Sequence, residues 1–330
     1  MRKEVLLLTK KICVIGGGKW GKNHIRTLYE IGHLGGIVES DKEKLNSLLD
    51  NFPCESFENI EEAINNGFTG YVVATPAETH YEIGKTLLEK GKNVLIEKPL
   101  ALSSIESEEL VKIAEQNGVQ LMVGHLLLFH PAIRKIKEIV DQGKIGNLYY
   151  IYSNRLNLGT VRTEENVFWS FAPHDISVME YLVGQPPIEI QAKGTKFLQN
   201  DIEDVTITQL TYPDNVHGHI FVSWLHPFKE QRLVLVGSKG MISFEDSSKD
   251  KEIKFYNKKI DWESNFPVKV EKPDEVIDYQ GEPPLKKELE YFIENLDKKI
   301  EIADGRSGHE VIKVLEKAQE FLEKGKNAYE

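Results

Sequence analysis

The first third of the chain alternates short apolar runs with longer amphipathic stretches. The apolar runs that have the length of buried strands are 11–15, 36–38, 70–74, 94–97 and 120–123. The amphipathic stretches that predict helices are 23–31, a segment from 42 onward, 59–65, 78–90 and 104–117. Strands that alternate with helices of this length form parallel βαβ units, so this region predicts a doubly wound parallel α/β sheet.

The remainder of the chain has a different pattern, in which β-branched and apolar runs recur with turns between them. The runs that predict strands are 148–156, 188–192, 205–212, 216–224, 232–236, 241–244 and 253–255. The stretches that predict helices are 131–141, 174–182, 284–297 and 308–323. Turns such as P-D-N at 213–215 favour antiparallel hairpins. We therefore expect two domains, 1–126 and 127–330, the second an α+β domain on a mainly antiparallel open sheet.

An open sheet of this kind can cover one face with its own helices and leave the other for a partner subunit. The sequence thus favours a homo-oligomer, a dimer or a tetramer, formed through the C-terminal sheet.

The composition of the chain argues against nucleic-acid binding, metal or thiol-redox sites and membrane insertion. The 330 residues are 40% hydrophobic and 28% charged, and the net charge of -11 gives no general field for binding nucleic acid. Cys13 and Cys54 lack the spaced partners of a metal or thiol-redox site. No apolar run approaches the roughly 20 residues that span a bilayer, and the run at 5–8 is too short for a signal peptide, so we expect a cytoplasmic protein that binds neither membrane nor metal.

A glycine-rich turn, G-G-G-K-W-G at 16–21, directly follows the first predicted strand. In a dinucleotide-binding Rossmann fold, Gly16 permits the tight turn, Gly18 lets the pyrophosphate approach and Gly21 lets the helix pack on the strand. The second strand ends at Glu39, where an acid can bind the adenosine ribose hydroxyls. A carboxylate with no arginine after it favours NAD over NADP. Asp41 is open to another interpretation, as the N-cap of the next helix.

Ligands of such sheets bind beyond the carboxyl ends of the strands. Thr75, Pro76, His80, Glu97 and Lys98 fall at these ends. An ammonium group there can stabilise an alkoxide, although a surface ion pair is the common role of a lysine. The residues that we assign to cofactor binding are Gly16, Gly18, Lys19, Trp20, Gly21, Glu39, Ser40, Thr75, Pro76, His80, Glu97 and Lys98. His125 and His130 follow the last parallel strand and are further candidates, either for the site or as buried structural histidines.

Together, the glycine turn, A-T-P at 74–76 with His80, and E-K-P-L at 97–100 resemble the Gfo/Idh/MocA oxidoreductases over essentially the whole chain. The resemblance implies an NAD(P)-dependent oxidation of a secondary sugar hydroxyl. It implies that Lys98 contacts the substrate hydroxyl, that Glu97 positions the nicotinamide region, and that His174 at the start of a helix takes the proton. Here the family's D-x-x-x-H pattern has Ser170 in place of the aspartate, which puts the substrate in doubt.

The short sequences at 154–159 and 173–177 most resemble the branch of the family that contains UDP-N-acetylglucosamine and UDP-N-acetylglucosaminuronate 3-dehydrogenases. Free polyols and free sugars are the other substrate classes. The residues that we assign to the substrate are Lys98, Arg155, Asn157, Arg162, Trp169, His174 and Asp175, the last of which could instead be a helix N-terminal charge. Two other functions stay open: an NAD-dependent redox-elimination glycosidase of the same fold, and a non-catalytic dinucleotide sensor.

Overall fold

The computed structural model describes residues 10–324, which form two compact units. Unit 1 comprises residues up to 126 together with Pro283–Ile312, and unit 2 comprises Leu127–Glu282 and the residues from 313 onward. The sequence analysis assigns 283–312 to the second domain, 127–330, whereas these residues cluster with unit 1. The short apolar run at 5–8 lies outside the described residues.

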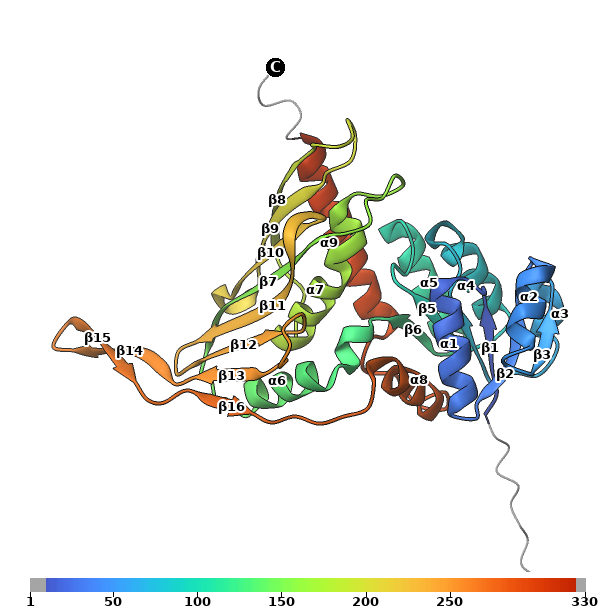
Figure 1. The fold of residues 1–330 in the computed structure, drawn as a ribbon, viewed down its shortest axis with the longest axis horizontal. Helices are drawn as coiled ribbons and strands as arrows, with labels where there is room; N and C mark the ends of the chain where they lie inside the picture. The colour runs from blue at the N-terminus through green and yellow to red at the C-terminus, as the bar shows by residue number, and fades with distance from the viewer. Residues whose placement is uncertain (1–9, 325–330) are drawn as a thin grey trace, which may run out of the picture. The chain divides into compact units, whose positions relative to one another are not determined.

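Unit 1 is built on a six-stranded parallel sheet in the order β3-β2-β1-β4-β5-β6 (Figure 1). Its strands are β1 (Ile12–Ile15), β2 (Leu34–Val38), β3 (Glu55–Phe57), β4 (Gly70–Val73), β5 (Val94–Glu97) and β6 (Leu121–Gly124). Its helices are α1 (Lys19–Glu30), α2 (Lys42–Leu49), α3 (Ile60–Ile64), α4 (His80–Glu89), α5 (Ser104–Asn117), α8 (Pro284–Glu294) and the first part of α9 (Gly305–Lys324).

The strand order of this sheet confirms the predicted Rossmann architecture. It reverses between β1 and β4, and the carboxyl ends of these two strands mark the crevice where ligands bind in such sheets. Strands β1, β4 and β5 are buried because helices cover the sheet, which explains their continuous apolar runs. Two details differ from the prediction. Helix α1 begins at Lys19 rather than at 23, directly from the glycine turn, and β3 has only three residues, too few to show a periodicity.

Unit 2 is built on an eight-stranded sheet in the order β16-β13-β12-β11-β7-β10-β9-β8. Its strands are β7 (Leu148–Leu158), β8 (Glu189–Thr195), β9 (Val205–Thr211), β10 (His217–Ser223), β11 (Leu225–Gly237), β12 (Met241–Glu245), β13 (Ile253–Tyr256) and β16 (Glu275–Ile277). All neighbours in it are antiparallel except β7 and β10, which are parallel, so the mainly antiparallel sheet is confirmed.

One face of this sheet is covered by α6 (Pro131–Asp141), α7 (Val167–Val183) and the second part of α9 (Figure 1). The alternation of side chains along the strands follows from this arrangement. In β9, Thr206 and Thr208 are buried, whereas Ile207 between them is 52% exposed. Outside the sheet, β14 (Lys258–Glu263) and β15 (Phe266–Glu271) form a separate two-stranded hairpin that the sequence analysis did not predict.

The predicted start of the helix at His174 is wrong. Helix α7 begins at Val167, because the side chain of Asn166 accepts hydrogen bonds from the amides of Phe168 and Trp169, both at 3.1 Å. Pro173 therefore lies inside the helix, and His174 and Asp175 lie two turns from its start. Asp175 cannot be the N-terminal helix charge that its sequence position suggests. Within residues 10–324, no helix is long and apolar enough to cross a membrane.

Candidate active site

The glycine turn between β1 and α1 has the geometry of a phosphate cradle. Gly16 has a φ of 97°, and a Cβ there would lie 2.8 Å from the carbonyl oxygen of Ala74. A Cβ on Gly21 would lie 1.8 Å from the carbonyl oxygen of Gly16, so the helix can approach the strand only with glycine at this position. A Cβ on Gly18 would meet nothing within 4 Å, and Gly18 has no side chain to cap α1. The start of α1 thus has no side-chain cap and has open space beside Gly18, which fits the pyrophosphate of a dinucleotide.

Glu39 lies at the end of β2 and is 8% exposed. Its Oε2 accepts a hydrogen bond from the amide of Gly17 at 2.8 Å, and its Oε1 accepts one from the amide of Asp41 at 3.1 Å. Burial raises the pKa of Glu39, but these two amides and the nearby Lys44 outweigh burial and hold the pKa below its ordinary value. An ionised acid beside the glycine turn is suited to adenosine ribose hydroxyls and repels a 2′-phosphate. Asp41 caps α2 through the amides of Glu43 and Lys44, which confirms that interpretation for Asp41.

His80 connects two loops of the ligand edge. Its Nδ1 lies 2.7 Å from the carbonyl oxygen of Pro99, and its Nε2 lies 2.9 Å from that of Thr75. The side chain is 1% exposed. His80 thus ties the loop after β4 to the loop after β5, and its effect on a ligand would pass through the backbone of these loops. The Lys98–Pro99 peptide bond is cis.

Glu97 and Lys98 end β5, as the sequence predicts. Oε1 of Glu97 lies 2.6 Å from Nε2 of His24, a residue of α1 that is fully buried. Burial raises the pKa of Glu97, but the hydrogen bond and charge of His24 and the charge of Lys98 outweigh it, so the pKa is lowered. Glu97 is therefore an ionised carboxylate beside the Lys98 ammonium. This pair of opposite charges, at the carboxyl edge of the sheet, can bind and polarise a hydroxyl group.

In unit 2, the expected substrate residues Arg155 and Asp175 form a buried ion pair. Nε and Nη2 of Arg155 donate to Asp175 at 2.9 and 3.0 Å, and Oγ of Ser153 donates to Oδ1 of Asp175 at 2.6 Å. Burial lowers the pKa of Arg155, but the charge of Asp175 outweighs it and raises the pKa. Asp175 follows His174 on α7 and anchors this part of the helix to β7.

The other expected substrate residues of unit 2 lie around the start of α7. Arg162 is exposed and its carbonyl oxygen accepts a hydrogen bond from Gln199. Trp169 and His174 are half-buried on α7, and Ser170 is buried. The Oδ1 atom of Asn157 is buried without a hydrogen-bond partner among the described residues.

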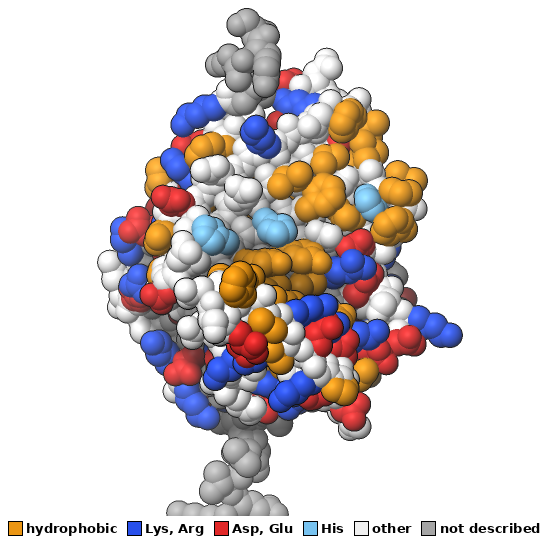
Figure 2. Space-filling view, turned by 90° about the vertical axis from the view of Figure 1, so that its left-hand side faces the viewer, with side chains coloured by type: hydrophobic (Ala, Val, Ile, Leu, Met, Phe, Trp, Pro, Cys, Tyr) orange, Lys and Arg blue, Asp and Glu red, His pale blue; other side chains and the backbone are white. Residues whose placement is uncertain are grey.

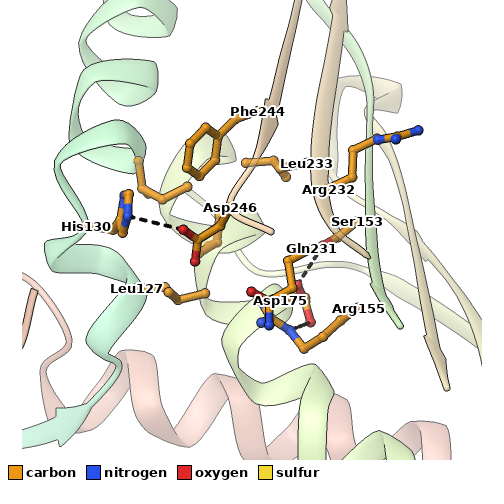
Figure 3. A pocket seen from close by; sticks show the side chains of 12 residues that line it. Leu127, His130, Ser153, Arg155, Asp175, Gln231, Arg232, Leu233, Phe244 and Asp246 are labelled. Carbon is orange, nitrogen blue, oxygen red and sulfur yellow. Dashed lines mark hydrogen bonds and ion pairs between the residues drawn. The ribbon is translucent and has the colours of Figure 1, made fainter. Parts of the chain in front are cut away.

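A pocket of unit 2 with both polar and apolar walls lies beside the Arg155–Asp175 pair (Figure 3). Its polar wall includes Ser153, Gln231 and Asp246, and Nε2 of His130 lies 3.8 Å from Oδ1 of Asp246. Its apolar wall consists of Leu127, Ile133, Val178, Leu233 and Phe244. His130 also caps α6 by accepting from the amide of Ala132, and burial lowers its pKa. His130 therefore has a structural role, as one of its two interpretations predicts.

Two of the residues described above, His24 and Asp246, were absent from the sequence-based site. His24 has a detectable signal, since it lies three positions after Gly21 on the helix that the glycine turn begins. Asp246 has none, because it reaches His130 and Arg155 from a segment far away along the chain. Among residues 10–324, no group of three or more His, Cys, Asp or Glu side chains could hold a metal ion.

Comparison with known proteins agrees with this arrangement. The oxidoreductase family model with an NAD-binding Rossmann fold matches residues 10–125, and the GFO/IDH/MocA C-terminal domain model matches residues 133–243. An uncharacterised oxidoreductase, YrbE of Bacillus subtilis, is 26% identical over 258 residues, which cover 73% of this chain and 75% of that protein. UDP-N-acetylglucosamine 3-dehydrogenase of Acidithiobacillus ferrooxidans is 26% identical over 182 residues, which cover 55% of this chain and 56% of that protein.

Solved structures share the whole fold. That of the same A. ferrooxidans dehydrogenase, GnnA, has a TM-score of 0.83 at 21% identity and covers 95% of this chain and 98% of its own. The WlbA dehydrogenase of Bordetella pertussis, solved with NADH and UDP-GlcNAcA, has a TM-score of 0.77 at 20% identity and covers 96% of this chain and 97% of its own. With both family models matched and a glycine turn that fits the cofactor, the chain belongs to the Gfo/Idh/MocA family of NAD-binding oxidoreductases.

Proposed function

We propose that this oxidoreductase oxidises a secondary hydroxyl of a sugar nucleotide by hydride transfer to NAD. The observation that carries the proposal is the Glu97–Lys98 pair at the end of β5, in the same unit as the glycine turn and Glu39. A UDP-linked N-acetylamino sugar oxidised at C3 is the substrate class that we propose, and the names of two relatives support it. Free sugars and polyols are the alternative class, since inositol dehydrogenases are also among the relatives.

In this proposal, each polar residue has a distinct task. The first amides of α1 hold the pyrophosphate, and Glu39 holds the adenosine ribose. Bound NAD supplies the hydride acceptor. Lys98 stabilises the negative charge that develops on the substrate oxygen, and His174 accepts the hydroxyl proton. Arg155 and Ser153 hold Asp175 and thereby fix the part of α7 that carries His174.

The substitution Lys98→Met tests the central role directly. It removes the ammonium but keeps a side chain of similar length, so the glycine turn and NAD binding should be unaffected. We expect kcat to fall by about 10²–10⁴-fold, the range typical of a positioned acid-base or charge-stabilising group. The dissociation constant for NAD, measured by tryptophan fluorescence, should stay within about 3-fold of wild type, a change of less than about 1 kcal/mol.

Lys112→Met is the matched control, because Lys112 forms an ordinary surface pair with Glu108 on α5. It should leave both quantities unchanged. Wild-type turnover by the Lys98→Met protein would remove Lys98 from the mechanism, and a lost affinity for NAD would assign it to cofactor binding.

We further propose that the uncovered face of the unit 2 sheet binds other copies of this chain, forming a dimer or a tetramer. On this face, the ring of His219 stacks on Tyr150 and Tyr152, with centroid distances of 6.4 and 5.1 Å. Ile207 and Phe228 are 52% and 58% exposed. Figure 2, viewed from the side of this sheet, shows apolar side chains gathered around histidines. Exposed apolar patches of this kind mark association surfaces.

A further inference from the structure

Unit 1 contains a group of four buried titratable side chains, which we call the acid–histidine cluster. Its members are His24 of α1, Glu97 of β5, His125 after β6 and Glu288 of α8. His24 and Glu288 are fully buried, His125 is 2% exposed, and the Glu97 side chain is 12% exposed. Buried ionisable groups are rare unless they are paired, so each member needs a physical explanation.

Glu97 is the charged centre of the cluster. Its Oε1 is bound by His24 at 2.6 Å, and its Oε2 accepts a hydrogen bond from the Lys98 amide at 3.2 Å. Gly124 makes room for it, because a Cβ on Gly124 would lie 3.0 Å from the Cδ atom of Glu97. The neighbouring His125 is neutral at physiological pH, since burial lowers its pKa to about 4. The negative charge of the cluster therefore resides on Glu97.

Glu288 is the member without a function in the fold. Neither of its carboxyl oxygens has a hydrogen-bond partner among the described residues. It lies on the buried side of α8 with Leu289 and Phe292, and α8 packs against α1, which carries His24. Burial raises the pKa of Glu288 well above its ordinary value, and the charge of Glu97 raises it further. Glu288 is therefore protonated while Glu97 is ionised, as expected of two acids that share a buried region.

The charged groups around the cluster determine how readily the carboxyl group of Glu288 loses its proton. The groups that act on its members are His24 from α1, Glu97 and Lys98 from the end of β5, and Glu288 itself from α8. A further positive charge near Glu97 would offset its repulsion of a second carboxylate. Ligands of this fold bind beyond the carboxyl ends of the strands, where Glu97 lies. The oxidised nicotinamide ring carries a positive charge and the reduced ring carries none.

We propose that Glu288 exchanges a proton with solvent according to the redox state of the cofactor: it is protonated in the free protein and with NADH, and gives up its proton when NAD⁺ binds. This inference rests on the proposed function. On NAD⁺ binding, the Glu288 O–H bond breaks, the carboxylate stays in the cluster, and the proton goes to solvent. During turnover, the substrate carbon gives up the hydride, and His174 takes the hydroxyl proton and releases it to solvent. The Glu288 carboxylate takes up one proton from solvent, so one proton is released and one is taken up.

The experiment is isothermal titration calorimetry of the full chain with NAD⁺ and with NADH, each in two buffers of different ionisation enthalpy. The dependence of the heat on the buffer gives the number of protons released. The two ligands share the same pyrophosphate and differ in the charge of the nicotinamide, so the difference between them isolates the response to that charge. We expect proton release with NAD⁺, none with NADH, and no release with NAD⁺ in the E288Q variant.

Glu290→Gln is the matched control on the same helix, because Glu290 is partly exposed and pairs with Lys287. It should release protons as wild type does. Equal release by wild type and E288Q, or no release by wild type that binds NAD⁺, would overturn the inference and leave the proposed function intact. A protein that binds neither ligand would overturn both. If E288Q does not fold, the infrared carbonyl band of a protonated carboxylic acid in the wild type should weaken on addition of NAD⁺, and an unchanged band would contradict the inference.

Discussion

Arg155 and Asp175 form the most buried ion pair of unit 2 that involves an arginine, with side chains 15% and 3% exposed. Asp175→Asn would leave the guanidinium buried without its counter-ion. We expect the free energy of unfolding to fall by about 3–5 kcal/mol, the range for a buried pair that loses one partner. In the double variant R155M/D175L, which removes both charges, most of this loss should be recovered.

Urea unfolding of the three proteins measures these differences. The control is Glu108→Gln at the exposed pair with Lys112, which should cost no more than about 1 kcal/mol. If Asp175→Asn costs no more than the control, the ion pair does not hold α7 on the sheet.

Glu39 gives a prediction about pH. Its pKa in the folded protein lies below the ordinary value, because the amides of Asp41 and Gly17 and the charge of Lys44 outweigh burial. A lowered pKa stabilises the fold above the unfolded-state pKa of about 4.3, and this contribution disappears as the pH falls through the folded-state pKa. The stability of E39Q should therefore depend less steeply on pH below about 5 than that of wild type.

Urea midpoints measured from neutral to acid pH test this expectation, with E30Q at an exposed glutamate of α1 as the control. Parallel pH profiles for wild type and E39Q would show that the two amide contacts do not stabilise the charged form.

Individual site residues could be predicted from the sequence where a local pattern fixes their position. Lys98 and Glu39 were found because each ends an apolar strand of a parallel sheet, and the ends of such strands meet at one edge. The sequence places His24 on the helix after the glycine turn, but it does not show that His24 contacts Glu97, and it gives no signal for Glu288. The His24–Glu97 contact joins α1 to β5, and the packing of α8 on α1 depends on the whole of unit 1.

At the scale of elements, the β14–β15 hairpin differs from the rest of unit 2 in that its strands pair only with each other. Trp262 and Phe266 are 72% and 73% exposed. An isolated two-stranded hairpin with large exposed apolar side chains is marginally stable in water, and contact with another copy of this chain, as proposed above, would stabilise it. We expect the variant W262S/F266S to form a smaller assembly than wild type, with little change in the stability of the subunit fold.

Light scattering after size-exclusion chromatography measures the mass of the assembly. The control is Ile105→Ser, because Ile105 is a comparably exposed apolar side chain, 78% exposed, on α5 of unit 1. An unchanged mass for W262S/F266S would exclude the hairpin from the interface.

The sequence predicted helices and strands well where a regular pattern of apolar residues extended over many positions. It missed them where two local signals disagreed or where the turn signal was weak. The proline before His174 suggested a helix start, but the cap at Asn166 begins α7 at Val167, six residues before Pro173. The hairpin turn at Ser264 and Asn265 takes positive φ angles of 48° and 72°, and this pair of residues is a weaker turn signal than Asn-Gly.

At the scale of the whole molecule, the order of elements predicted the two folds because a parallel and an antiparallel sheet have different periods of apolar residues. The return of Pro283–Ile312 to unit 1 was not predictable in the same way. Helix α8 is amphipathic, and its pattern of apolar residues predicts that one side is buried. The pattern does not indicate which sheet that side packs against.

The proposed reaction of the whole protein is the transfer of a hydride from a sugar hydroxyl to NAD. The most direct test is the nicotinamide absorbance of the protein with NAD⁺ and a panel of UDP-N-acetylamino sugars, free sugars and inositols, with each product identified by mass. We expect reduced nicotinamide and a 3-keto product with a UDP-N-acetylamino sugar, and neither in K98M. NAD⁺ that binds but stays oxidised with every compound would contradict the account, and release of a free sugar without NADH would indicate the redox-elimination glycosidase instead.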